Sequence, residues 1–142
     1  MSSTALTRIH HVGVVVRDLE QAYGFWRDVL GLPVHKVATV EDQGVRAALL
    51  TIGESEIELL EPLSPASGIG KFLAKRGEGL HHICYATEDV AAALEEARAK
   101  GVRLIDEKPR PGLAGTICFL HPASTHGVLV EYAEPFSDGV HT

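Results

Sequence analysis

The sequence contains an internal duplication, and this feature restricts the possible folds more than any other. Ile9-His10-His11-Val12 corresponds to Leu80-His81-His82-Ile83, and 71 residues separate the two segments. The halves also end alike, because Glu58-Leu59-Leu60-Glu61-Pro62 corresponds to Glu131-Tyr132-Ala133-Glu134-Pro135 at a separation of 73 residues. A match at both ends, at nearly constant separation, predicts two structural modules with a common plan.

The separation also sets the module boundaries. We place module one at residues 7–63, a linker at 64–78 and module two at 79–136. The 142 residues have the length of one compact domain, which we assign to residues 1–142.

The periodicity of each module predicts a strand, a helix and three further strands. Asp18 is placed to cap the first helix and Gly31 to end it, and Gly101 is placed to end the second helix. The expected strands of module one are 8–16, 34–40, 45–52 and 56–61. In module two we expect strands at 80–86, 102–105, 115–121 and 127–133, and a helix at 90–100. One or two helical turns are expected in the linker, around Phe72. The fold class is therefore α+β, with two βαβββ modules.

Four residues with metal-binding side chains occupy equivalent positions in the two modules. Alternation along the strands places His11 and His82 on matching faces of the two first strands, and Glu58 and Glu131 on matching faces of the two last ones. Two imidazoles and two carboxylates suit a divalent first-row ion such as Co²⁺, Ni²⁺, Mn²⁺, Fe²⁺ or Zn²⁺. Any one of these residues alone is more often a hydrogen-bonded core histidine or a solvated glutamate. The symmetric set of four favours a metal.

Composition excludes some partners. The chain has 13 Lys and Arg against 19 Asp and Glu, a formal charge of −6, so a generally basic, nucleic-acid-binding surface is not expected. No uncharged stretch is free of Gly and Pro over the length of a membrane span, so we expect no membrane association. Cys84 and Cys118 lie in apolar strand-like segments, and we expect both to be reduced thiols of a cytoplasmic protein.

Several stretches resemble a known family. They are Ile9–Gly13, Asp42–Val45, Glu56–Leu63, Ile69–Leu73, Gly79–Ile83, Phe119–Pro122 and Gly127–Glu131. With them the chain is similar to the vicinal-oxygen-chelate superfamily of glyoxalases and bleomycin-resistance proteins, and within it to the methylmalonyl-CoA epimerases. The resemblance implies that the two modules pair into an incomplete barrel around a metal site.

The resemblance also implies an activity. Carried over residue by residue, the family's metal ligands fall on His11, His82 and Glu131, and its fourth position falls on Glu58. One divalent ion per chain is implied, with Co²⁺ first and Mn²⁺, Ni²⁺, Zn²⁺ or Mg²⁺ as alternatives. The implied reaction interconverts the (2R) and (2S) forms of methylmalonyl-CoA, a small-molecule CoA thioester, through a metal-stabilised enolate. Glu131 and Glu58 are the expected catalytic bases, and a homodimer is the expected assembly.

The sequence departs from the family at two positions, and other functions stay open. Ala47 stands where some epimerases carry a glutamate proposed as a base, and Ala123 stands where many members carry Lys. Substrate-binding residues are therefore not assigned. Six cationic residues are possible contacts for coenzyme A: Arg46, Lys71, Lys75, Arg76, Lys108 and Arg110. The alternatives are a metal-dependent lyase of the glyoxalase I type and a non-enzymatic binding protein of the same fold.

Overall fold

A computed structural model describes residues 5–136 of the chain, which divides into two compact units. The first, the His11 unit, comprises residues 11–81. The second, the His82 unit, comprises residues 82–136 together with 5–10. The unit boundary falls within two strands, β1 (Leu6–Val15) and β5 (Gly79–Thr87), so each unit takes a few residues from the start of the other half's first strand.

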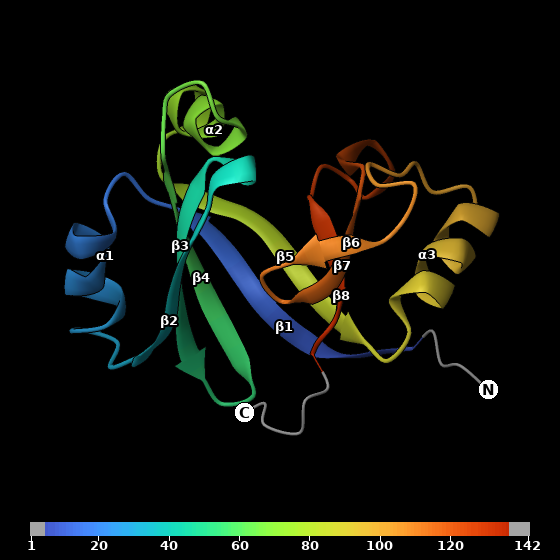
Figure 1. The fold of residues 1–142 in the computed structure, drawn as a ribbon, viewed down its shortest axis with the longest axis horizontal. Helices are drawn as coiled ribbons and strands as arrows, with labels where there is room; N and C mark the ends of the chain where they lie inside the picture. Colours follow the sequence, from blue (N-terminus) through green and yellow to red (C-terminus); the bar gives the residue numbers. More distant parts are fainter. Residues whose placement is uncertain (1–4, 137–142) are drawn as a thin grey trace. The chain divides into compact units, whose positions relative to one another are not determined.

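The His11 unit is a four-stranded sheet with one face covered by a helix (Figure 1). Its elements after β1 are α1 (Leu19–Trp26), β2 (Val34–Val40), η1 (Glu41–Gln43), β3 (Val45–Ile52), β4 (Ser55–Pro62) and α2 (Gly68–Arg76). The strand order is β2-β3-β4-β1, where β4 is parallel to β1 and antiparallel to β3.

The His82 unit repeats this arrangement. Its elements after β5 are α3 (Val90–Ala99), β6 (Arg110–Gly112), β7 (Gly115–Leu120), η2 (Pro122–Ser124) and β8 (Val130–Glu134). The strand order is β5-β8-β7-β6, where β8 is parallel to β5 and antiparallel to β7. The element order confirms the predicted α+β class with two βαβββ modules.

Both helices that cover the sheets begin in the same way. Asp18 Oδ1 accepts a hydrogen bond from Gln21 N at 2.9 Å, and Asp89 Oδ1 accepts one from Ala92 N at 3.0 Å. These side chains satisfy N–H groups that a helix N-terminus leaves without a partner. The predicted cap at Asp18 is thus confirmed, and Asp89 caps the second helix in the same way.

A second carboxylate, from the last strand of each unit, binds the first residue of each helix. Glu61 Oε2 accepts from Leu19 N at 2.9 Å, and Glu134 Oε1 accepts from Val90 N at 3.0 Å. The negative charge also lies at the positive end of the helix dipole. These bonds fix each helix to the strand that carries the Glu of the candidate site.

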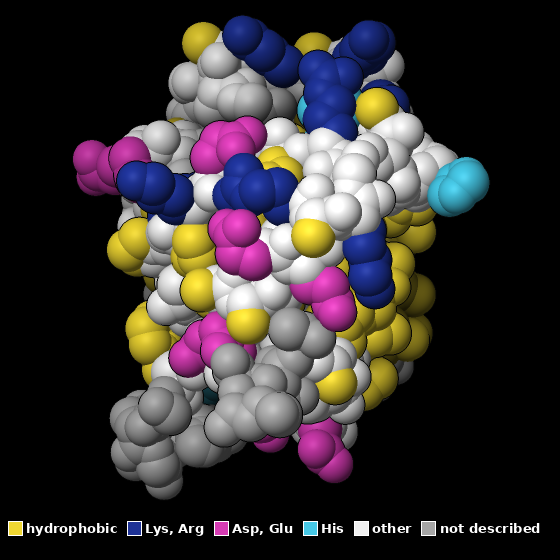
Figure 2. Space-filling model, turned by 90° about the vertical axis from the view of Figure 1, so that its right-hand side faces the viewer, with side chains coloured by type: hydrophobic (Ala, Val, Ile, Leu, Met, Phe, Trp, Pro, Cys, Tyr) yellow, Lys and Arg dark blue, Asp and Glu magenta, His cyan; other side chains and the backbone are white. Residues whose placement is uncertain are grey.

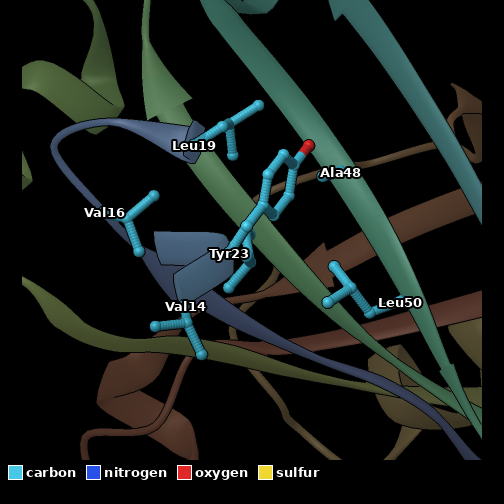
Figure 3. Close-up of a cluster of buried hydrophobic side chains, with 7 residues drawn as sticks. Val14, Val16, Leu19, Tyr23, Ala48 and Leu50 are labelled. Atoms are coloured by element: carbon cyan, nitrogen blue, oxygen red, sulfur yellow. The ribbon is translucent and has the colours of Figure 1, made fainter. Parts of the chain in front are cut away.

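The core of the His11 unit lies between α1 and one face of the sheet (Figure 3). Tyr23 and Leu19 point from α1 towards Ala48 and Leu50 of β3. Leu50 and Leu59 are fully buried, and burying a Leu side chain contributes about 1.5–3 kcal/mol. The buried cluster is Val14, Val16, Leu19, Tyr23, Ala48, Leu50 and Leu59. In the His82 unit α3 covers the corresponding face, where Val90, Leu94, Ala97, Cys118 and Leu120 cluster.

Three predicted boundaries were wrong. Helix α1 ends at Trp26 rather than continuing to Gly31. Beyond Trp26 the bonding departs from the regular four-residue pattern, since Asp28 N bonds the carbonyl five residues back, Tyr23 O, at 2.9 Å. Residues 102–105 form no strand and make only the bridge Leu104–Leu120, while the third-from-last strand is instead β6. The last strand, β8, begins at Val130 rather than residue 127.

The linker forms α2, which is longer than the one or two turns expected. Ser67 caps it by accepting from Gly70 N at 3.0 Å, and Phe72 on this helix packs edge-on against the ring of His81 at 5.0 Å. Within the described residues, no helix has the length and apolar character needed to cross a membrane.

Acidic and basic side chains are mixed on the face of the molecule that lies on the α3 side of Figure 1. Figure 2 shows Lys and Arg gathered towards one end of that face, with Asp and Glu among and below them. The described part of this face is therefore not of one sign, in agreement with the composition.

Candidate metal site

The His11 unit carries a buried histidine–glutamate pair on the sheet face opposite α1. His11 alternates with Val14 and Val16 of the core, so its side chain points to the other face of β1. Glu58 lies on the neighbouring strand β4, where it is in register with Gly13. His11 Nε2 and Glu58 Oε1 are 3.3 Å apart, and the two residues are only 2% and 7% exposed.

The His82 unit carries an equivalent pair. Glu131 of β8 is in register with Cys84 of β5, two residues beyond His82, as Gly13 is two residues beyond His11. His82 Nε2 and Glu131 Oε1 are 3.2 Å apart, and the residues are 6% and 4% exposed. The two units therefore repeat the same strand pairing and the same side-chain pair.

The donors in these pairs fit a divalent metal ion. An ionised carboxylate removed from water is costly unless a cation or several hydrogen bonds compensate its charge. Imidazole and carboxylate are ligands that first-row divalent ions accept. Each pair also lies among apolar neighbours, which limits water access: Val15, Ala47, Leu49 and Leu60 in one unit, and Cys84, Ile117 and Ala133 in the other.

Both cysteines, Cys84 and Cys118, are buried. Neither forms a disulfide, and neither has exposed surface. Burial, with a smaller contribution from the charges of Asp106 and Glu131, raises the pKa of Cys118 to about 12. A thiol that holds its proton this strongly is a poor nucleophile at neutral pH.

The other histidines have different surroundings. His10 is buried and His81 contacts Phe72. His35 Nδ1 lies 2.7 Å from Glu56 Oε2 in an exposed pair. His121 Nδ1 accepts from Ala123 N at 2.9 Å and so caps η2. His141 lies outside the described residues.

Half of the possible coenzyme A contacts are held by neighbouring side chains. Arg46 Nη1 lies 3.7 Å from Glu61 Oε1, and the guanidinium of Arg76 lies over the ring of Phe72 at 5.6 Å. Arg110 Nε donates to Asp106 Oδ1 at 2.8 Å. Lys71, Lys75 and Lys108 are exposed.

The family model of the Glyoxalase/Bleomycin resistance protein/Dioxygenase superfamily matches residues 10–119. The chain belongs to this superfamily. Its fold is that of the vicinal-oxygen-chelate family, since the structure of a Streptomyces coelicolor methylmalonyl-CoA epimerase in complex with 2-nitronate-propionyl-CoA aligns with a TM-score of 0.89. That alignment has 44% identity and covers 94% of this chain and 97% of the other.

The most similar relatives include epimerases of CoA thioesters, a narrower group within the superfamily. The mitochondrial methylmalonyl-CoA epimerase of Mus musculus is 39% identical over 89% of this chain and 72% of its own length. The ethylmalonyl-CoA/methylmalonyl-CoA epimerase of Cereibacter sphaeroides is 39% identical over 87% of this chain and 95% of its own length. Within the superfamily the chain thus groups with the epimerases, which are isomerases.

Sequence reasoning missed the second carboxylate of each module and the neighbours of His82. Glu61 and Glu134 are visible in the repeated Glu-x-x-Glu-Pro, and three-residue spacing on a strand sends the two carboxylates to opposite faces. Asp106, Arg110 and Phe119 belong to one half only, so no repeat connects them, although the sequence already names Arg110 as a possible coenzyme A contact and Phe119 within a family-like stretch.

Proposed function

We propose that the protein interconverts the (2R) and (2S) forms of methylmalonyl-CoA. The observation that carries this proposal is the equivalent buried pair in each unit, His11 with Glu58 and His82 with Glu131. The similarity to epimerases over most of the chain supplies the substrate class, a CoA thioester.

The four residues together would hold one divalent ion, for which Co²⁺ is our first candidate. Both imidazoles and both carboxylates are buried, and their donor types suit such an ion. The ion, when bound, would supply Lewis-acid stabilisation of the negative charge that develops on the thioester oxygen of the substrate.

The two carboxylates would move the proton. The α-proton lies between a thioester and a carboxylate, so its removal leaves a planar enolate. The carboxylate of Glu131, leaving the ion for this step, would take the proton, and Glu58, protonated and likewise detached from the ion, would return a proton to the opposite face and so invert the centre. The opposite enantiomer reacts with the two roles exchanged, so protons and charge balance over the cycle.

Ala47 makes Glu58 the stronger candidate for the second base. Ala47 is 1% exposed and opposes Leu60 on β4, so it lies on the same face of the sheet as Glu58. An alanine has no group that moves protons. A water molecule activated by the ion is the alternative second base.

We also propose a cytoplasmic homodimer. The two buried cysteines form no disulfide with each other, which suits a reducing compartment. Large apolar side chains are exposed, among them Leu80 at 73% and Val29 at 69%, and a second copy is the occupant we propose for such a surface.

The test is exchange of the α-proton. Metal-loaded protein is incubated in deuterated buffer with methylmalonyl-CoA, and with ethylmalonyl-CoA in parallel, and deuterium at the α-carbon is followed by mass spectrometry. Incorporation well above the rate in buffer alone is expected. Absence of exchange with both thioesters would overturn the proposal.

Two further arms separate the alternatives. The hemithioacetal of methylglyoxal and glutathione tests the lyase, and its turnover without thioester exchange would favour that reaction. Elemental analysis and a Co²⁺ titration test the binding protein, for which neither bound metal nor affinity is expected.

A further inference from the structure

We infer that Phe119 is a positioning residue for the imidazole of His82, and that Asp106 and Arg110 hold Phe119 in place. The inference rests on the proposed function, because it gives His82 the role of a ligand. All four residues belong to the His82 unit, so the argument uses contacts within one unit only.

The ring of Phe119 meets His82 nearly at a right angle. The ring centroids are 5.8 Å apart and the interplanar angle is 79°, which is a favourable edge-to-face arrangement. Phe119 is also in register with Glu131 on the adjacent strand β8. One aromatic ring therefore adjoins the strand position of the carboxylate and touches the imidazole of the same pair.

Asp106 ties Phe119 down from two directions. Its Oδ2 accepts the backbone N–H of Phe119 at 2.8 Å, and its Oδ1 accepts Arg110 Nε at 2.8 Å. The guanidinium of Arg110 lies over the Phe119 ring, with Cζ 5.6 Å from the centroid. One carboxylate thus fixes both the backbone of the phenylalanine and the cation that covers its ring.

A histidine ligand needs this kind of support. Rotation about χ2 of His has a broad energy profile, because it joins a tetrahedral carbon to a planar ring. A small rotation moves the Nε2 lone pair away from an ion, and groups around a ligand commonly restrict such motion. The edge-to-face contact with Phe119 opposes it.

The first half carries a different residue at the position equivalent to Phe119. Leu49 holds the equivalent position, because it opposes Glu58 on β4 as Phe119 opposes Glu131 on β8. Leu49 is 5% exposed and fills space, but it has no ring to set the orientation of His11. Phe119→Leu therefore copies the residue that the chain itself uses in the first half, and is a matched test.

The first experiment measures Co²⁺ affinity and the visible absorption of the Co²⁺-loaded protein. For Phe119→Leu we expect affinity to fall about two- to tenfold, less than the roughly 10–100-fold typical when a hydrogen-bonded partner of a ligand is lost. The absorption bands should also change, since they report ligand geometry. Phe119→Tyr keeps the ring and should stay within about twofold of the parent, while Asp106→Asn should lie between.

Urea unfolding of the metal-free variants serves as the control for general packing. Unchanged Co²⁺ affinity and spectrum in Phe119→Leu would overturn the inference. Equal losses of affinity in Phe119→Leu and Phe119→Tyr, in parallel with stability, would also overturn it, because the ring would then matter only as packing.

A second readout separates this inference from the proposed function. In the metal-free protein, NMR signals of the His82 ring should show one orientation in the parent and averaging in Phe119→Leu. If the parent binds no Co²⁺, the proposed metal site fails, yet the NMR comparison still decides whether Phe119 orients the ring. Equal averaging in both proteins would refute it.

Discussion

Glu131→Gln should separate metal binding from folding, because it removes a charge and keeps the shape of the side chain. Glu131 is 4% exposed and lies 3.2 Å from His82 Nε2. The matched control is Glu134→Gln, three residues further along β8, where the carboxylate binds Val90 N at 3.0 Å instead. The same substitution on the same strand thus tests a proposed ligand and a helix cap.

The expected size follows from linkage. At a free Co²⁺ concentration 100 times the Kd, binding adds about 2.7 kcal/mol to the free energy of unfolding. With an unfolding entropy of about 2.1 cal/mol/K per residue, a chain of 142 residues gains about 9 °C in Tm. A 100-fold weaker Kd in Glu131→Gln would leave about 0.4 kcal/mol, or about 1 °C, at the same concentration.

The two variants should differ in opposite senses. Metal-free Glu131→Gln should melt at or above the parent temperature, since a neutral amide is cheaper to bury than a carboxylate. Glu134→Gln should lower the free energy of unfolding by about 0.5–1 kcal/mol, with and without Co²⁺, and therefore lower the Tm. It should keep the full metal-dependent rise in Tm. Thermal unfolding with and without Co²⁺ measures both. A full rise in Glu131→Gln, or an equal loss in both variants, would refute the assignment of Glu131 as a ligand.

Two further predictions concern packing and titration. Gly70→Ala should lower the free energy of unfolding by about 1–3 kcal/mol, since the added Cβ would lie 2.2 Å from Ser64 O. Gly68→Ala in the same helix has open space around its Cβ and should be neutral or slightly stabilising. Urea unfolding measures both, and equal effects would contradict this prediction. Burial raises the pKa of Cys118 to about 12, whereas a thiol in the unfolded chain titrates at about 8.5. The unfolded state therefore loses its proton first, and the free energy of unfolding should fall as pH rises above about 8.5. Urea unfolding at several pH values should show a smaller fall for Cys118→Ala, and an identical pH dependence would count against the buried thiol.

The features set by strict periodicity were predictable from the sequence. Alternation along the strands predicts that His11 and His82 hold equivalent positions, as do Glu58 and Glu131, and in the structure His11 lies 3.3 Å from Glu58. The equivalent pair, His82 and Glu131, lies 3.2 Å apart. Helix starts were also predictable, since an aspartate at the cap position has a local hydrogen-bonding partner.

Features set by tertiary contacts were not predictable. Strand β6 has the sequence Arg110-Pro111-Gly112, in which Pro and Gly are unfavourable for a strand. Its place follows from contacts distant in sequence, namely the bond of Arg110 to Asp106 and the close fit of Gly112, whose Cβ would lie 2.5 Å from Ile117. Beyond the end of α1 the helical spacing of apolar residues continues to Val29, but that side chain is 69% exposed. The apolar pattern therefore extends past the residues that pack against the sheet.

The repeated Glu-x-x-Glu-Pro explains how a duplicated strand keeps its site in register. Two glutamates three residues apart lie on opposite faces, so Glu58 meets His11 while Glu61 binds the first N–H of α1 at 2.9 Å. A slip of β4 by one residue would exchange the faces, placing an apolar side chain beside the histidine and leaving the helix without its second carboxylate. The helix bond therefore penalises any register that would misplace the proposed ligand, and the same argument holds for β8 with Glu134 and α3. Both modules contain the two glutamates of this arrangement, so each module has its own means of holding a buried carboxylate in place.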